Sequence, residues 1–563
     1  MQDELLIAKT EKKVYEILPH DPETMAATLF VIGMAAYYLW RMFVITPQHE
    51  ELESFFLFIN NGPLYSAMNW PSPNNHIGYS VLSAFLNYFG NNYIGLRGVS
   101  FICAISNLIL VYRICKKYFT HAMPFGATVL YASMQVVSDY AVQGRGYTLA
   151  TFCFLLAFYC ITEICKLGET KKIHVVTFII CVVYGVYTTP SSIYWAVPVC
   201  LTALVFLFIN GFRSRQVYDS DSENIYLRKL NSFLASVGVC IFSTLMLYTV
   251  IWLMVGARQL IGTEGSQFFG DTDLTVLIRN PVQALGTGIR FMNDQRRMSI
   301  GEVDLFRDMF FTWIVDLLNY MLPGLWLILL GFIISGLIIM ITECIRHFAY
   351  SRTVLNLMAI INIGYVVLIL ISTHNLPSLR GFGYGSFIMT ICICSTVEKV
   401  INVGVRSYNK YVGDDRQSET HRENEYVKST GKWYDGIGVY IPVAVIILLF
   451  IVRLFDKTYT SQIATRENDI LNAMYIADIS HRKNPCVLDI DQDYLLNFAF
   501  DIDCPNTNVN GCDVVILDRN LMTPGYNGEY ASRFYQSYET IDWEYLDTMH
   551  IQYENDSIIL YTR

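Results

Sequence analysis

About eleven apolar runs, each close to the length of a bilayer crossing, divide the sequence and limit the folds open to it. A helix needs about 20 predominantly apolar residues to span the hydrocarbon core of a membrane. Hydrophobic residues make up 53% of the 563 positions and charged residues only 16%, which is unlike ordinary soluble domains. We therefore expect a polytopic α-helical membrane protein. The runs lie near 24–45, 95–113, 122–139, 147–165, 174–190, 191–211, 232–256, 321–343, 353–372, 382–402 and 437–455.

Basic residues in the short loops predict how the chain crosses the membrane, because lysine and arginine concentrate on the cytoplasmic side. One set of loops carries most of them, and the opposite short loops contain no lysine. We expect segment 1–23 in the cytoplasm and the C-terminus outside the plasma membrane. The basic loop residues are Arg113, Lys116, Lys117, Lys166, Lys171, Lys172, Arg213, Arg215, Arg228, Lys229, Arg346, Arg352, Arg406 and Lys410.

Three regions outside the spans follow from this layout. Within the transmembrane domain 24–455, the outer loops 46–94 and 257–320 mix apolar stretches with Gly, Pro and Asn, and helices on the membrane surface are expected there. Residues 456–563 contain 18 acidic and 7 basic residues and are expected to form a soluble extracytoplasmic α/β domain. Its predicted strands are 486–490, 513–518 and a hairpin in 549–563, and its predicted helices lie near 461–480 and 528–540.

An acidic cluster follows the first apolar run in the stretch "TPQHEELESFF", residues 46–56. It contains His49, Glu50, Glu51 and Glu53 in a chain that otherwise avoids charge near its apolar segments. The ordinary interpretation is a solvated helix end. The alternative is a catalytic carboxylate at the membrane boundary that takes a proton from an attacking hydroxyl group.

Three arginines are expected on the outer side, against the usual bias, namely Arg97, Arg145 and Arg380. A single arginine of this kind often extends to the phosphates of lipid headgroups. Three arginines on the same side as an acid pair favour the interpretation that this side binds an anionic ligand. They would neutralise a phosphate leaving group.

Two histidines and two acidic motifs are weaker signals. His49 and His76 are each ordinary for a polar loop, but with Glu50 or Glu51 they could hold a divalent metal ion at a phosphate. Asp-x-Asp occurs at 489–491 and 501–503, and this motif binds the metal in glycosyltransferases that use nucleotide sugars. The expected topology places both copies outside, where such donors are absent.

The order of these motifs resembles a known family. The acid pair, "PNNH" before an amphipathic helix, "NNYIGLRGVS" and "SDYAVQGRGYTLATF" are similar to the N-terminal half of GT-C glycosyltransferases, in the bacterial branch of protein O-mannosyltransferases and aminoarabinose transferases. The family's catalytic Asp-Glu pair maps to Glu50 and Glu51, with Glu in place of the usual Asp. Its Arg-Gly-Tyr maps to Arg145, Gly146 and Tyr147, and a late arginine maps to Arg380.

The resemblance implies transfer of a sugar from a polyprenyl-phosphate donor to a glycan, lipid or protein acceptor at the outer face, with inversion. Glu50 or Glu51 would be the base, and Arg145, Arg380 and Arg97 would bind the phosphate. Tyr147 and His76 would shape the donor pocket. The alternative is a polytopic transporter or flippase of lipid-linked saccharides, but transporters place ionisable residues within the spans. Nucleic acid is excluded as a partner by the net charge of -9 and the lack of a basic stripe.

Overall fold

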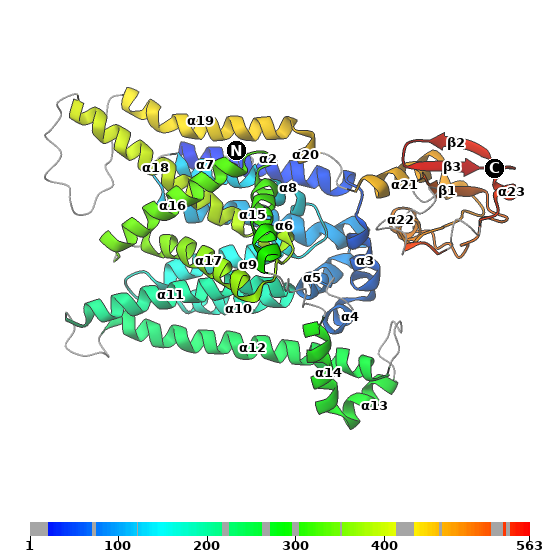
Figure 1. The fold of residues 1–563 in the computed structure, drawn as a ribbon, viewed down its shortest axis with the longest axis horizontal. Helices are drawn as coiled ribbons and strands as arrows, with labels where there is room; N and C mark the ends of the chain where they lie inside the picture. The colour runs from blue at the N-terminus through cyan, green and yellow to red at the C-terminus, as the bar shows by residue number, and fades with distance from the viewer. Residues whose placement is uncertain are drawn as a thin grey trace, which may run out of the picture. The chain divides into compact units, whose positions relative to one another are not determined.

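The computed structural model divides the chain into two compact units, whose elements are labelled in Figure 1. We call residues 1–38, 100–141 and 146–460 the helical unit, and residues 39–99, 142–145 and 461–563 the sheet unit. The structure describes residues 21–69, 75–120, 122–216, 224–261, 271–294, 303–348, 352–411, 433–460, 464–519, 533–535 and 541–563.

Long apolar helices correspond to most of the predicted spans, which confirms a polytopic helical membrane protein. Among the described residues, eight helices are long and apolar enough to cross a membrane. They are α2 (Pro22–Val44), α6 (Asn92–Tyr118), α9 (Tyr147–Ile164), α11 (Ile193–Arg213), α12 (Ile225–Ile261), α16 (Trp326–Arg346), α17 (Arg352–Thr373) and α18 (Gly385–Tyr411). The other three predicted runs contain the helices α7 (Met123–Ala132), α10 (Lys172–Thr188) and α19 (Trp433–Phe455).

The run near 122–139 differs from the expected single helix. Helix α7 ends at Ala132, and a separate short helix, α8 (Gln135–Tyr140), follows it. The Ser133 hydroxyl donates to the Leu130 carbonyl, and Met134 has extended backbone angles. A serine that bonds its own backbone in this way competes with helix continuation. The break places the end of α8 just before the segment that carries Arg145.

The loop 257–320 contains helices, as the sequence predicted. They are α13 (Asp271–Arg279), α14 (Pro281–Asp294) and α15 (Val303–Met321). Figure 1 shows α14 beside the end of α12. Two glycines allow the backbones to meet, because a Cβ at Gly256 would lie 1.7 Å from the Ala284 carbonyl oxygen and one at Gly288 would lie 1.9 Å from that of Trp252.

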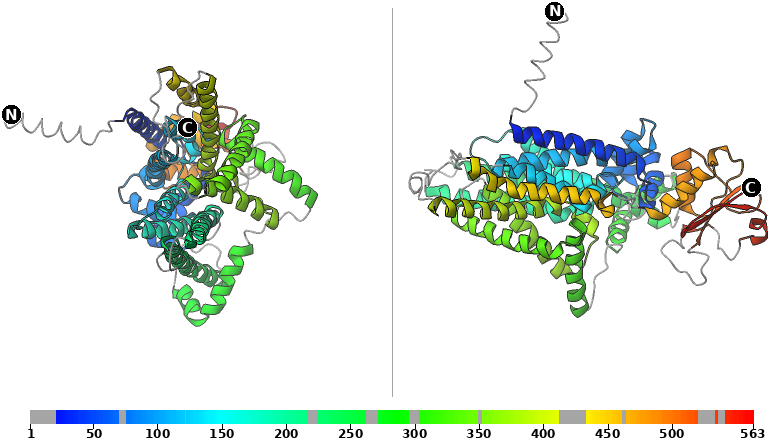
Figure 2. Two further views of the ribbon diagram at one scale, coloured as in Figure 1. Left: turned by 90° about the vertical axis from the view of Figure 1, so that its left-hand side faces the viewer. Right: turned by 90° about the horizontal axis from the view of Figure 1, so that it is seen from above.

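The sheet unit combines the loop 46–94 with the C-terminal segment. The first loop forms α3 (His49–Leu57), the 3-10 turn η1 (Ile59–Asn61), α4 (Pro63–Met68) and α5 (Ile77–Asn87). The C-terminal segment forms α21 (Thr465–Ile476), η6 (Ile479–His481), α22 (Ile490–Phe500), β1 (Val514–Asp518), α23 (Trp543–Leu546), β2 (His550–Glu554) and β3 (Ile558–Thr562). The antiparallel strands, red in Figure 2, have the order β1-β3-β2.

The structure agrees with three of the local predictions in this segment and corrects one. The predicted strand 513–518 is present as β1. The hairpin is present, and the Asn555 side chain accepts from the backbone N–H groups of Ser557 and Ile558 to close its turn. Helix α21 lies within the predicted 461–480. The predicted strand 486–490 is not formed as a regular strand: Pro485 and Asp489 make only isolated bridges. Asp489 caps α22 by accepting from the Gln492 N–H, so a helix starts at Ile490. The predicted helix near 528–540 lies mostly outside the described residues.

One hydrophobic core joins the two parts of the sheet unit. Leu52 and Phe55 of α3 are buried with side chains of α21, α22 and the sheet. The Phe55 ring meets Phe498 edge to face with centroids 5.0 Å apart, and Phe56 stacks on Tyr494 at 4.8 Å. Helix α3 is therefore packed directly against the C-terminal segment.

We predict that Gly288→Ala destabilises the protein, because the new methyl group must push the backbone of α12 away from α14. Overpacking of this kind typically costs about 1–3 kcal/mol. The matched control is Gly286→Ala in the same helix, where a Cβ would meet nothing within 4 Å. The apparent melting temperature in detergent should fall for Gly288→Ala only, and equal values for the two variants would contradict the described contact.

Candidate active site

The candidate acids lie in the first turn of α3, and the structure gives them different surroundings. Glu51 is buried, with 1% of its surface exposed, whereas the Glu50 side chain is 36% exposed. Successive residues of a helix point about 100° apart, because a turn takes 3.6 residues. When Glu51 faces the interior, Glu50 is therefore directed toward a different side of α3.

Glu51 makes a two-point ion pair with Arg97 of α6. Arg97 Nε donates to Glu51 Oε1 at 2.8 Å, and Arg97 Nη2 donates to Oε2 at 2.9 Å. The backbone N–H of Gln48 donates to Oε2 at 3.0 Å, and that of Gly144 donates to Oε1. Both carboxylate oxygens are thus used within the protein.

Arg97 is fully buried, and its remaining bonds also go to the protein. Its Nη1 donates to the carbonyl oxygens of Met42 at 3.0 Å and Ile45 at 2.6 Å, at the end of α2. The guanidinium therefore connects α2, α3 and α6. These contacts give Arg97 a structural role in holding Glu51, in contrast to the phosphate contact that the sequence predicted.

Gly144 allows the chain to approach this ion pair. A Cβ at this position would lie 2.4 Å from Leu96 Cδ1 and 3.0 Å from the Leu96 carbonyl oxygen. Only glycine can bring its N–H to Glu51 without moving α6. The Gly144 position also determines where the next residue, Arg145, begins.

Arg145 bonds helix α3 beside Glu50. Its Nη1 donates to Ser54 Oγ at 2.9 Å and to the Glu50 carbonyl oxygen at 3.2 Å, and its Nη2 lies 3.7 Å from Glu50 Oε2. Arg145 itself is buried. A fixed cation thus stands beside the partly exposed Glu50 carboxylate, which is the combination that proton removal next to a phosphate requires.

His76 lies in a buried polar turn at the start of α5. Its neighbour Asn75 donates to the carbonyl oxygens of Asn69 at 2.6 Å and Ser66 at 3.2 Å, and accepts from Ser80 Oγ at 2.8 Å. His76 is 7% exposed. These bonds fix the backbone that presents His76 within the sheet unit.

Tyr147 and Arg380 belong to the helical unit, where they lie near the same tyrosines. The rings of Tyr140 and Tyr147 are 4.8 Å apart, and Tyr320 of α15 lies 6.5 Å from Tyr140. Arg380 interacts electrostatically with both Tyr140 and Tyr320. Tyr140 and Tyr320 were not among the predicted site residues, although Tyr140 shortly precedes the Arg-Gly-Tyr motif in the sequence.

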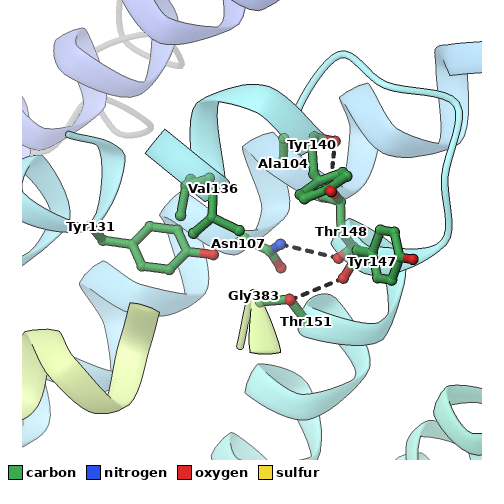
Figure 3. Close-up of a pocket in the computed structure, with 10 residues that line it drawn as sticks. Ala104, Asn107, Tyr131, Val136, Tyr140, Tyr147, Thr148, Thr151 and Gly383 are labelled. Atoms are coloured by element: carbon green, nitrogen blue, oxygen red, sulfur yellow. Dashed lines mark hydrogen bonds between the residues drawn. The ribbon is translucent and has the colours of Figure 1, made fainter. Parts of the chain in front are cut away.

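A small pocket lies beside these residues (Figure 3). Its lining includes Tyr131, Tyr140, Tyr147 and Asn107, which bring hydroxyl groups and one amide among apolar side chains. Asn107 Nδ2 donates to the Thr148 carbonyl oxygen at 3.3 Å. The pocket measures about 20 Å³, which suits a water molecule and not a sugar.

The first Asp-x-Asp motif is part of a buried ion cluster in the sheet unit. Arg466 Nη2 donates to Asp489 at 2.7 Å, Nη1 donates to Asp491, and Nε donates to Asp518 at 2.8 Å. Burial raises the pKa of Asp489 to about 6, against the opposing charge of Arg466. Burial would also raise the pKa of Asp491, but the bond to His49 and the charge of Arg466 hold it below its usual value.

The His49 ring contacts this cluster through a bond between its Nδ1 and Asp491 Oδ1. Among the described residues, no group of three or more His, Cys, Asp or Glu side chains is arranged to hold a metal ion. Metal binding by His49 stays a prediction, and the observed partner of its ring is an aspartate.

Comparison with known proteins identifies the type of enzyme. Residues 77–227, which include Arg97, Arg145 and Tyr147, match the family described as dolichyl-phosphate-mannose-protein mannosyltransferase. The expected relation to the GT-C glycosyltransferases is thus confirmed. The prediction of a membrane glycosyltransferase is also confirmed. No curated protein matches the chain.

Two solved structures resemble the chain over most of its length. ArnT from Cupriavidus metallidurans bound to undecaprenyl phosphate shares 12% identity with a TM-score of 0.50, and 95% of this chain and 97% of that chain are covered. The apo state of the same protein gives 10% identity, a TM-score of 0.47 and the same coverage. The first likeness shows that the glycosyltransferase has an ArnT-like fold.

We predict that Glu51→Gln destabilises the protein and that Glu50→Gln does not. Removing one charge of a buried pair leaves the other uncompensated, which typically costs about 3–5 kcal/mol. The two variants make the same chemical change at adjacent positions. Thermal unfolding in detergent should give a lower midpoint for Glu51→Gln only, and a wild-type midpoint for this variant would mean that the buried pair contributes no stability.

Proposed function

We propose that the protein transfers a sugar from a polyprenyl-phosphate donor to an acceptor hydroxyl group at the extracytoplasmic face of the plasma membrane, with inversion. The observation that carries the proposal is the partly exposed Glu50 carboxylate beside the buried Arg145. The distribution of basic loop residues supports a cytoplasmic N-terminus and an outer C-terminal segment. The ArnT structure of similar fold is bound to undecaprenyl phosphate, which supports a lipid phosphate as carrier.

Glu50 is the base in this mechanism. It takes the proton of the acceptor hydroxyl group while the acceptor oxygen forms a bond to the anomeric carbon. The bond between that carbon and the phosphate oxygen breaks, and its electron pair leaves with the polyprenyl phosphate. Attack from the side opposite the phosphate inverts the anomeric centre.

Glu51 is proposed as a positioning residue because its two oxygens accept bonds from Arg97, Gln48 and Gly144. A base must be able to reach the proton that it removes. The Glu50 side chain is partly exposed and can therefore reach the acceptor hydroxyl group. The longer side chain of Glu, where the family has Asp, extends the carboxylate one methylene further from α3.

The negative charge on the departing phosphate needs cations to stabilise it. Arg145 is proposed for this role because Ser54 and the Glu50 backbone fix its guanidinium. Arg380, Tyr147 and His76 stay predicted ligands of the donor, as the family resemblance implies. No step is assigned to a metal ion.

The test is Glu50→Gln, with Glu53→Gln on the same helix as the matched control. Loss of general base catalysis typically costs about 10²–10⁴-fold in rate. In membranes supplied with radiolabelled polyprenyl-phosphate sugars, Glu50→Gln should show that loss in label transfer, and Glu53→Gln should remain near the wild type. Full transfer by Glu50→Gln would reject the mechanism, and label that crosses the membrane without transfer would favour the flippase.

A further inference from the structure

We infer that the C-terminal segment positions the catalytic base through a bonded link that runs from Arg466 through Asp491 to His49. This inference rests on the proposed role of Glu50, which follows His49 directly in α3. We call His49, Glu467, Asp491 and Arg466 the His49 link. All four belong to the sheet unit.

The link holds the first residue of α3 by two separate bonds. The His49 backbone N–H donates to Glu467 Oε1 at 3.1 Å, and the His49 ring bonds Asp491 through Nδ1. The first N–H groups of a helix have no partner within the helix, and a carboxylate is favoured there by the helix dipole. Both acids come from the C-terminal segment, more than 400 residues away in the sequence.

The other end of the link is rigid because its charges are buried and paired. Arg466 is held between three aspartates, and its separate donor atoms Nε, Nη1 and Nη2 each bond one of them. Asp491 Oδ2 accepts from Arg466, which leaves Oδ1 for His49. The position of the His49 ring is therefore set by a guanidinium that cannot rotate without losing bonds to Asp489 and Asp518.

The bonds on α3 divide into three sets that surround Glu50. His49 is bonded to the C-terminal segment, Glu51 to Arg97, and Ser54 to Arg145. The partners of Glu51 and Ser54 lie in α6 and in segment 142–145. The partner of His49 lies in the C-terminal segment. A displacement of about 1 Å in a catalytic group can cost about 10²-fold in rate. The C-terminal segment thus contributes to catalysis without touching the substrate, and His49 and Asp491 are positioning residues.

The chain contains a matched control for the link. His481 and Asp478 form the same kind of pair, Nδ1 to Oδ1 at 2.8 Å, but their side chains are 81% and 71% exposed and neither bonds α3. The corresponding values for His49 and Asp491 are 17% and 0%. The same substitution at His49 and at His481 removes a histidine–aspartate pair in both cases. Only the substitution at His49 also removes the link.

The experiment compares His49→Ala, His49→Asn and His481→Ala in the full chain, with kcat and the KM for a polyprenyl-phosphate sugar measured for each. We expect kcat to fall about 10–100-fold in His49→Ala with a smaller change in KM, because the substitution displaces the base directly and reaches Arg145 only through its bonds to α3. Asparagine can present its amide N–H close to the position of Nδ1, so His49→Asn should restore most of kcat. His481→Ala should match the wild type.

Two results would overturn the inference. One is wild-type kcat in His49→Ala, and the other is equal loss in His49→Asn and His49→Ala, which would mean that the ring contacts substrate or metal directly. If His49→Ala does not fold, the activity of His49→Asn still tests the inference. Only a link through Nδ1 predicts that the His49→Asn variant is active. The proposed function is tested separately by Glu50→Gln, which leaves the His49 link intact.

Discussion

The buried ion pair between Glu51 and Arg97 is the interaction on which the candidate site depends. Moving two charges out of water is costly, and their mutual attraction offsets this only when the remaining donors and acceptors are bonded. Here Glu51 also accepts from two backbone N–H groups, and Arg97 also donates to two carbonyl oxygens at the end of α2. The pair thereby brings together the end of α2, the start of α3, α6 and the Gly144 segment.

Two adjacent glutamates acquire different roles as a result. The pair fixes the rotation of α3 about its axis, so that Glu51 is buried and Glu50 is partly exposed. The same rotation directs Leu52 and Phe55 into the core shared with the C-terminal segment. Arg145 follows Gly144 and bonds the side of α3 that carries Glu50. In this account the base, the phosphate ligand and the C-terminal segment are all positioned relative to one helix of nine residues.

The membrane-spanning helices could be predicted from the sequence because their signal is local. Apolar length alone indicates α2, α6 and α9, whatever surrounds them. The break after Ala132 was missed, because hydropathy does not mark it; at this point the Ser133 hydroxyl bonds the Leu130 carbonyl oxygen. The strand predicted at 486–490 is not regular, since the apolar run Cys486–Leu488 outweighed the helix cap at Asp489 in the prediction.

The sequence predicted which residue types belong to the site. It did not predict which residues they contact. An arginine next to an apolar run is visible in the sequence, but its partner is not. Arg97 was expected to face a phosphate, and its bond to Glu51, 46 residues earlier, appears only in the fold. Likewise nothing near His49 in the sequence indicates Asp491, and Tyr320 has no motif around it. Such pairings depend on long-range packing.

The central claim is that Glu51 and Arg97 stay paired while Glu50 serves the reaction. Its most direct test is an experimental structure of the protein with a polyprenyl-phosphate sugar bound, at a resolution that shows side chains. The account predicts that Arg145 contacts the phosphate, that the Glu50 carboxylate is open to the acceptor side of the sugar, and that both Glu51 bonds to Arg97 are unchanged. A structure in which Glu51 has left Arg97 and reaches the ligand would contradict it.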